Sequence, residues 1–155
     1  DWWPDRPESH EARESIARGA TEIDMVINIA ALKNGRLDDV LIDIEEVVEV
    51  AYSLGALTKV IIETALLTDD EKRRACELVT RADADFIKTS TGFASHGATV
   101  EDVRLLKSCV GPSVRVKASG GIRSADFARE LLEAGADRLG MSAGVSVVNS
   151  WPASA

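Results

Sequence analysis

Five short apolar segments, rich in β-branched residues, alternate along the chain with longer segments of helical periodicity. The apolar segments occupy residues 22–28, 58–64, 85–89, 113–117 and 137–141. Apolar residues recur three or four positions apart in the segments between them, 36–55, 68–82, 99–111 and 124–136, and we expect a further helix over 8–19. Strands that alternate with helices predict a parallel sheet with its helices on the outside.

Capping residues mark the expected helix ends. Thr68 precedes a run of acidic residues, which is typical of an N-cap followed by a first helical turn. Thr99 is followed three positions later by Asp102, a spacing close to that of a capping box, and Ser124 begins the last of these helices. Gly55 ends the longest helical segment, as a glycine commonly does.

The order of the elements favours a (β/α) barrel over an open doubly wound sheet. A doubly wound sheet would carry a glycine fingerprint after its first strand, and "NIAALKNG" at 28–35 has none. Polar residues follow several strands, as expected where a barrel collects its functional side chains. A full barrel has eight strands and roughly 250 residues, however, whereas this chain of 155 residues shows five. Such a sheet would leave unpaired edges.

Two lysines end successive predicted strands: Lys88 in "DFIKT" and Lys117 in "SVRVK". Neighbouring strands lie about 4.8 Å apart, so their ammonium groups should be close together. A partly desolvated amine that faces a second cation loses its proton more readily and can attack a carbonyl group, which predicts a Schiff-base enzyme. Asp24 in "EIDMVIN" should share the strand-end layer and move protons, and Lys59 could join the cluster.

Glycine-rich turns follow the last two predicted strands. "SGGIR" occupies 119–123 and "GMSAG" occupies 140–144. Adjacent glycines let backbone N–H groups approach an anion, and a following helix adds its positive end. A phosphate group would fit here, and Arg123 could either touch it or simply begin a solvated helix.

Each feature also has a structural interpretation when it is taken alone. A strand-end lysine is more often ion-paired or snorkelling than catalytic, a Gly-Gly pair is most often a turn, and Asp24 could pair with a structural lysine. His10 and His96 have no partner spacing and are interpreted as surface residues. The catalytic hypothesis depends on the conjunction of acid, two lysines and glycine turns at successive strand ends.

Composition narrows the class of partner. The net charge of −8 argues against nucleic acid and anionic membranes as partners. No apolar run approaches the roughly 18 residues that a membrane span requires, and no signal peptide is visible. Cys76 and Cys109 lack metal or redox spacing, so we expect two free thiols in a reducing, cytoplasmic setting.

The motifs "EIDMVIN", "KVIIETALL", "ADFIKTSTGF" and "VKASGGIR" resemble deoxyribose-phosphate aldolase in order and spacing, over about residues 19–147. The resemblance implies a TIM (β/α)8 barrel of which this chain holds the equivalents of strands 4 to 8, as one partial domain over 1–155. It also implies reversible class I cleavage of 2-deoxy-D-ribose 5-phosphate to D-glyceraldehyde 3-phosphate and acetaldehyde, with neither cofactor nor metal.

The same resemblance assigns roles to residues. Lys88 would form the Schiff base, while Lys117 and Asp24 would donate and accept protons. The substrate phosphate would be bound by a further set, with Thr91 nearby: Gly120, Gly121, Gly140 and Ser142. The family usually has two adjacent hydroxyl residues in the last loop, whereas here Ser142 is followed by Ala143, which predicts weaker phosphate binding.

The shortness of the chain leaves three interpretations open. The chain could be a fragment, a short form that completes its barrel as a homo-oligomer, or a relative that keeps the residues without the activity. Alternative functions are a lysine-dependent aldolase with another substrate, and a non-catalytic sugar-phosphate-binding or assembly module. Replacing Lys88 distinguishes an aldolase from a binding module, because an aldolase should lose its activity whereas a binding module should still bind sugar phosphates.

Overall fold

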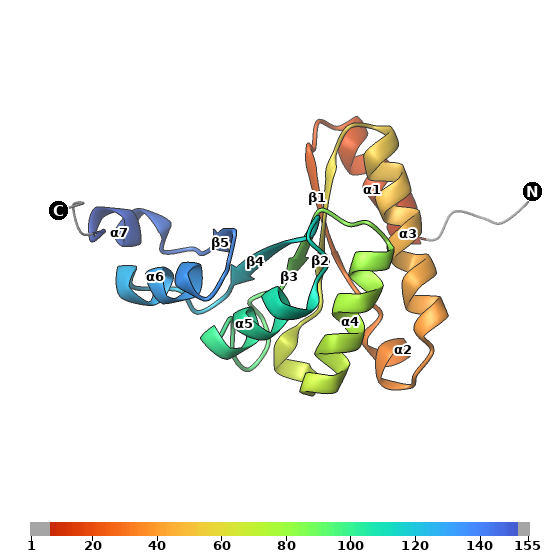
Figure 1. Cartoon of the computed structure of the whole chain (residues 1–155). Helices are drawn as coiled ribbons and strands as arrows, with labels where there is room; N and C mark the ends of the chain where they lie inside the picture. The colour runs from red at the N-terminus through yellow and green to blue at the C-terminus, as the bar shows by residue number, and fades with distance from the viewer. Residues whose placement is uncertain (1–6, 152–155) are drawn as a thin grey trace, which may run out of the picture.

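A computed structural model describes residues 7–151, so both ends of the predicted domain, 1–6 and 152–155, lie outside the described residues. Five strands form one parallel sheet in chain order (Figure 1). They are β1 (Glu22–Val26), β2 (Leu57–Ile61), β3 (Phe86–Lys88), β4 (Arg115–Ser119) and β5 (Arg138–Gly140). The predicted strands and their parallel pairing are confirmed, although each strand is shorter than or offset from its apolar segment.

The five predicted helices are present as well. They are α1 (Pro7–Ala17), α3 (Leu37–Ser53), α4 (Asp69–Arg81), α5 (Val100–Cys109) and α6 (Ala125–Glu133). Three short helices were not predicted: α2 (Ile29–Lys33), the 3₁₀ helix η1 (Thr64–Leu66) and α7 (Gly144–Asn149). They are too short to show a helical period, and α2 depends instead on Asn28, whose side chain accepts a hydrogen bond from the Ala31 amide at 2.9 Å.

The predicted helix caps form, with one difference. The Thr68 hydroxyl accepts from the Glu71 amide at 3.3 Å, and the Glu71 carboxylate accepts from the Thr68 amide at 2.8 Å, which completes a capping box. Thr99 accepts from the Asp102 amide in the same way. The Asp102 carboxylate does not return the bond, because Lys72 of α4 binds it at 2.7 Å in a buried ion pair.

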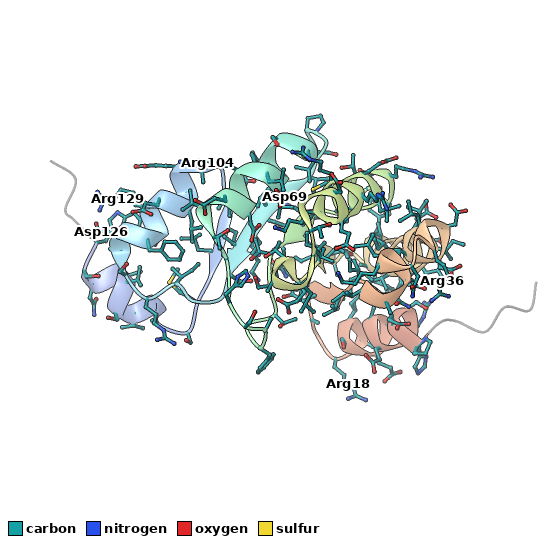
Figure 2. The ribbon with its side chains drawn as sticks, turned by 90° about the horizontal axis from the view of Figure 1, so that it is seen from below. Arg18, Arg36, Asp69, Arg104, Asp126 and Arg129 are labelled. Carbon is teal, nitrogen blue, oxygen red and sulfur yellow. The ribbon has the colours of Figure 1, made fainter. Side chains whose placement is uncertain are left out.

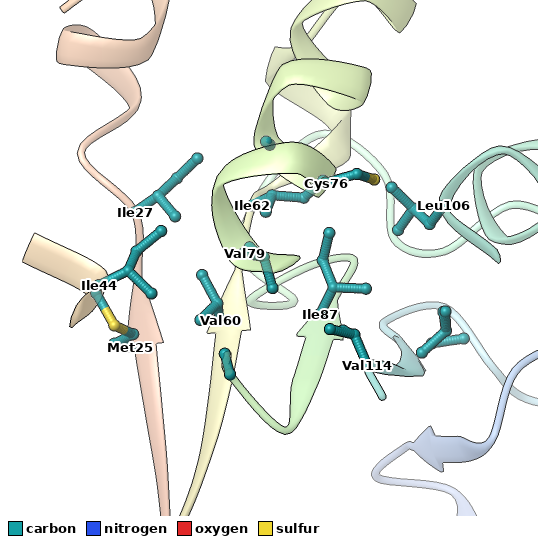
Figure 3. Close-up of a cluster of buried hydrophobic side chains, with 14 of the residues drawn as sticks. Met25, Ile27, Ile44, Val60, Ile62, Cys76, Val79, Ile87, Leu106 and Val114 are labelled. Carbon is teal, nitrogen blue, oxygen red and sulfur yellow. The ribbon is translucent and has the colours of Figure 1, made fainter. Parts of the chain in front are cut away.

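The core lies between the sheet and the helices that cover one of its faces (Figure 1). Side chains alternate along β1, so that Ile23 and Met25 are buried while Glu22, Asp24 and Val26 are partly exposed. Figure 3 shows the buried layer, where Met25, Val60 and Ile87 of the strands meet residues of the helices. The helix residues labelled there are Ile44, Cys76, Val79 and Leu106.

The opposite face of the sheet carries the charged side chains of β1 and β2, which separates the core from the polar residues. The charged side chains on the outer helices form exposed ion pairs between residues three positions apart. Arg36 pairs with Asp39 at 3.1 Å, and Arg129 pairs with Asp126; Arg36, Arg129 and Asp126 are labelled in Figure 2. Such exposed pairs contribute little to stability. No helix within 7–151 is both long and apolar enough to cross a membrane.

Candidate active site

The strand register decides which functional residues are level with one another. Lys88 of β3 is opposite Lys117 of β4, so the two lysines occupy equivalent positions as predicted. Asp24 of β1 is opposite Lys59 of β2. Val26 of β1 is opposite Ile61 of β2, which in turn is opposite Lys88 of β3, so Val26 is level with Lys88. Asp24 therefore lies two residues before the β1 position that is level with Lys88, an offset that pattern alone does not determine, yet its side chain contacts both lysines as expected.

The long lysine side chains nevertheless reach this carboxylate. Asp24 Oδ2 lies 2.6 Å from Lys88 Nζ and 3.8 Å from Lys117 Nζ. Asp24 Oδ1 lies 2.8 Å from Lys59 Nζ. One oxygen atom is thus shared between the two strand-end amines, and the other oxygen is held by the third lysine.

The electrostatics of the cluster lower the pKa values of Asp24 and Lys117. Burial raises the pKa of Asp24, but hydrogen bonds from Lys59 and Lys88 outweigh it and lower the pKa from 3.8 to about 2. Burial also lowers the pKa of Lys117, and the charges of Lys88, Lys59 and Arg138 add to this effect against the attraction of Asp24. Asp24 is therefore a stable anion, and Lys117 releases a proton more easily than an ordinary lysine.

Lys59 joins the cluster as expected, and Glu22 and Arg138, which sequence reasoning did not select, extend it. Lys59 is 4% exposed and binds Glu22 Oε2 at 2.8 Å as well as Asp24. Arg138 Nη1 lies 2.7 Å from the same Glu22 oxygen, so β5 and β1 are joined across the sheet. Glu22 lies two positions before Asp24 on the same strand face, a period that could have identified it.

Hydroxyl groups join the ends of β3 and β4. The Thr89 hydroxyl accepts from the Ser119 amide at 3.1 Å and from the Ser90 hydroxyl at 3.1 Å. Ser119 donates its hydroxyl to the Ser90 carbonyl at 2.6 Å. All three residues are buried, so this network fixes the two lysine-bearing strands relative to each other.

A cleft of about 410 Å³ opens beside the lysines. Its lining includes Lys88 and Lys117 and all five residues expected near the phosphate, namely Thr91, Gly120, Gly121, Gly140 and Ser142. Arg123 lines it too. Asp24 and Lys59 are not among its lining residues, so Asp24 reaches the cleft through the amines that it binds.

The glycine turn after β4 has a backbone that other residues would not adopt easily. Gly120 has φ +85° and Gly121 has φ +76°. A Cβ atom on Gly97 would lie 2.2 Å from the Gly120 carbonyl, so these two loops meet backbone to backbone. A Cβ atom on Gly140 would lie 3.1 Å from Lys117 Cε, which shows that Gly140 leaves room for this lysine.

One acidic residue at this end of the sheet was also missed. Glu63 follows β2, is 4% exposed and has a left-handed backbone with φ +54°. Its Oε2 accepts the Thr91 hydroxyl and, at 3.2 Å, the Thr91 amide. An acid directly after the apolar residues "VII" at 60–62 is a signal like the one that identified Asp24, and it could have been used here.

The remaining titratable candidates lie away from this cluster or are exposed. His10 and His96 are both exposed, as expected of surface residues. Within residues 7–151, no group of three or more histidine, cysteine or acidic side chains is placed to hold a metal ion. Cys76 is buried, and burial raises the pKa of its thiol to about 12.

Comparison with known proteins agrees with this geometry. A profile of the DeoC/LacD family of aldolases matches residues 2–150. The deoxyribose-phosphate aldolase of Thermococcus gammatolerans is 59% identical over 138 residues, which cover 89% of this chain and 61% of that protein. The chain therefore spans less than two thirds of the length of this relative.

Solved structures extend the likeness to the fold. The aldolase QR15 superposes with a TM-score of 0.86 at 45% identity, over 91% of this chain and 63% of that one. The deoxyribose phosphate aldolase of Aeropyrum pernix, described as having a unique tetrameric structure, superposes with a TM-score of 0.83 at 37% identity. The match covers 91% of this chain and 59% of that one. The predicted fold class is confirmed: five strand–helix units of the TIM-barrel type. The chain belongs to the DeoC/LacD family of aldolases.

Proposed function

We propose that this chain carries the catalytic half of a class I aldolase that reversibly cleaves 2-deoxy-D-ribose 5-phosphate to D-glyceraldehyde 3-phosphate and acetaldehyde. The observation that carries the proposal is a single carboxylate oxygen, Asp24 Oδ2, within reach of the amines of both Lys88 and Lys117, which line the cleft. The names of the relatives supply the substrate.

Lys88 is the nucleophile. It first loses a proton, which passes by way of Asp24 to Lys117, the amine with the lowered pKa. The neutral Lys88 amine then attacks the aldehyde carbon of the open-chain sugar, and water leaves to form the imine.

The imine then draws electrons from the bond that breaks. As the C3 hydroxyl gives up its proton, the C2–C3 bond cleaves, releases D-glyceraldehyde 3-phosphate and leaves an enamine on Lys88. Protonation at C2 followed by hydrolysis releases acetaldehyde and restores the lysine. Lys117 and Asp24 are the groups within reach that carry these protons.

The phosphate group is assigned to the glycine turn. Gly120 and Gly121 line the cleft and precede α6, so backbone N–H groups and the positive end of this helix can face an anion there. Ser142 lines the same cleft and can add a hydroxyl. Ala143 supplies no second hydroxyl, so we expect modest affinity for the phosphate group.

Borohydride trapping tests the proposal. Incubation with acetaldehyde, reduction and peptide mass spectrometry should place the adduct on Lys88, and Lys88→Arg should abolish it. Lys33→Arg is the matched control, because Lys33 is an exposed lysine that pairs with Glu71 at 3.0 Å away from the cleft. An adduct on Lys117 would reverse the two roles. Sugar-phosphate binding without any adduct would favour a non-catalytic module.

We also propose that the chain acts as a homo-oligomer. Within the described residues β1 and β5 each pair on one side only, and unpaired parallel edges favour association. The tetrameric Aeropyrum pernix relative agrees with this proposal. Native mass spectrometry tests the assembly, and a monomer at micromolar concentration would contradict it.

We place the reaction in the cytoplasm, where Cys76 and Cys109 would remain free thiols.

A further inference from the structure

Glu63 is a buried acid for which the proposed reaction has no use. It is 4% exposed, and its Oε1 has no hydrogen-bond partner within the described residues. Its φ of +54° is uncommon for a residue with a side chain and costs conformational energy. A buried polar group in a strained backbone requires an explanation, and residues of this kind gather at functional sites.

The surroundings of Glu63 hold it firmly against the segment that follows Lys88. The amide of the next residue, Thr64, donates to the Thr89 carbonyl at 2.9 Å. Glu63 Oε2 accepts both the amide and the hydroxyl of Thr91. The loop that carries the nucleophile is thus joined to the end of β2 through the main chain and through this carboxylate.

The hydrogen bonds of Thr91 determine what its hydroxyl can offer to a ligand. A hydroxyl has one proton to donate and two lone pairs that accept. The proton of Thr91 Oγ1 is donated to Glu63, and one lone pair takes the Phe93 amide at 3.2 Å. One lone pair remains, on a residue that lines the cleft. Thr91 can therefore accept a hydrogen bond from a ligand but has no proton left to donate.

We propose that Glu63 is a positioning residue: by binding the Thr91 proton, it makes the Thr91 hydroxyl an acceptor for a hydroxyl group of the sugar substrate. This inference rests on the proposed function, and it refines the expectation that Thr91 lies near the phosphate. A phosphate oxygen accepts hydrogen bonds and has no use for an acceptor, whereas a sugar hydroxyl donates to one. Among the described residues, the Glu63 carboxylate accepts its hydrogen bonds from Thr91, and Glu63 acts through this residue.

The test compares two compounds that each form an imine on Lys88, one without and one with hydroxyl groups. Acetaldehyde has no hydroxyl group, whereas 2-deoxyribose 5-phosphate has two in its open chain beyond the carbonyl. In Glu63→Ala, trapping of the acetaldehyde adduct on Lys88 should stay within about twofold of the parent. Trapping of the sugar phosphate should fall about five- to tenfold, as expected for one lost hydrogen bond. Glu63→Gln should restore it, because the amide oxygen can accept both Thr91 bonds.

Two further variants sharpen the result. Thr91→Val should show the same selective loss, and the double variant Glu63→Ala, Thr91→Val should lose no more than either one alone. Glu77→Ala, at an exposed position of α4, is the matched control and should behave as the parent with both substrates. An equal loss with both substrates, or none, would overturn the positioning role.

Failure of the proposed function can be recognised separately. If the parent forms no adduct with either compound, the aldolase proposal fails. Amide hydrogen exchange of the 88–93 segment then tests whether Glu63 positions Thr91. The Thr91 and Phe93 amides should lose protection in Glu63→Ala and keep it in Glu63→Gln. Unchanged protection in Glu63→Ala would contradict the inference.

Discussion

At the residue scale, the cluster around Asp24 shows how neighbours set the chemistry of a lysine. Lys88 and Lys117 approach the same oxygen at different distances, 2.6 Å and 3.8 Å, so they differ in how strongly the anion holds them. Lys117 has the weaker contact and is partly desolvated, which lowers its pKa. The proposed mechanism therefore assigns different roles to two residues of the same type.

The lowered pKa of Lys117 predicts a pH dependence. Its amine accepts a proton only when it is neutral, so the rate of imine trapping on Lys88 should rise with pH and level off below 10.5, the ordinary lysine value. Lys117→Arg cannot become neutral, so Lys88 must lose its proton to solvent and the rise should move to higher pH. Initial rates of adduct formation from pH 6 to about pH 10 measure this. A rise at the same pH in the parent and in Lys117→Arg would contradict the assignment.

At the element scale, loops and helices are fitted to one another by contacts that are distant in sequence. The loop before α5 meets the glycine turn after β4 at Gly97 and Gly120. Helices α4 and α5 are joined by the buried pair of Lys72 and Asp102. Both contacts lie next to elements that carry site residues, so they support the geometry of the cleft.

Gly97→Ala should destabilise the protein by about 3 kcal/mol, because its Cβ would lie 2.2 Å from the Gly120 carbonyl and force two backbones apart. Gly144→Ala is the control, since its nearest neighbour, Met141 Cγ, is 3.7 Å away. That change should stay within about 1 kcal/mol of the parent. Chemical denaturation measures both. Equal stability of the two variants would show that the loops can separate freely.

Asp102→Ala should cost about 3 kcal/mol, because it removes the buried partner of Lys72 at 2.7 Å and leaves the ammonium with the exposed carboxylate of Asp69 at 3.1 Å. The double variant Lys72→Met, Asp102→Leu removes both charges and should regain much of that loss. Urea unfolding of the parent and the two variants gives the comparison. A double variant less stable than Asp102→Ala would mean that the pair itself is strongly favourable.

At the scale of the whole molecule, an ionic chain crosses the sheet. Arg138 of β5 binds Glu22 of β1, Glu22 binds Lys59, and Lys59 binds Asp24. Hydrogen bonds from Lys59 and Arg138 lower the pKa of Glu22 from 4.5 to about 2. The first and last strands are thereby linked, although they do not pair in the sheet.

Acid should weaken this link within a defined window. Because the pKa of Glu22 is lowered by folding, its contribution to stability is complete above pH 4.5 and is lost as the pH falls towards about 2. Glu22→Gln lacks this contribution, so its melting temperature should fall less than that of the parent between those pH values. Glu77→Gln, at an exposed position of α4, should follow the parent. Circular dichroism melts across the window measure the difference, and parallel curves for parent and Glu22→Gln would contradict it.

Local pattern accounts for much of this structure. The five strands, their neighbouring helices and the cap at Thr68 follow from periodicity and capping chemistry, which act over a few residues. The same local signals brought Lys88 and Lys117 to equivalent strand ends, because parallel strands align their carboxyl ends. The sequence by itself therefore determined the five strands, the five longer helices, their order and the paired lysines.

Tertiary structure decided the rest. The offset that places Asp24 level with Lys59, yet within reach of both strand-end lysines, depends on register and side-chain length, neither of which a pattern specifies. The contact of Glu63 with Thr91 joins positions that are 28 residues apart, and only the pairing of β2 with β3 brings them together. Local propensity selects elements, whereas distances between side chains on different strands exist only once the sheet has formed.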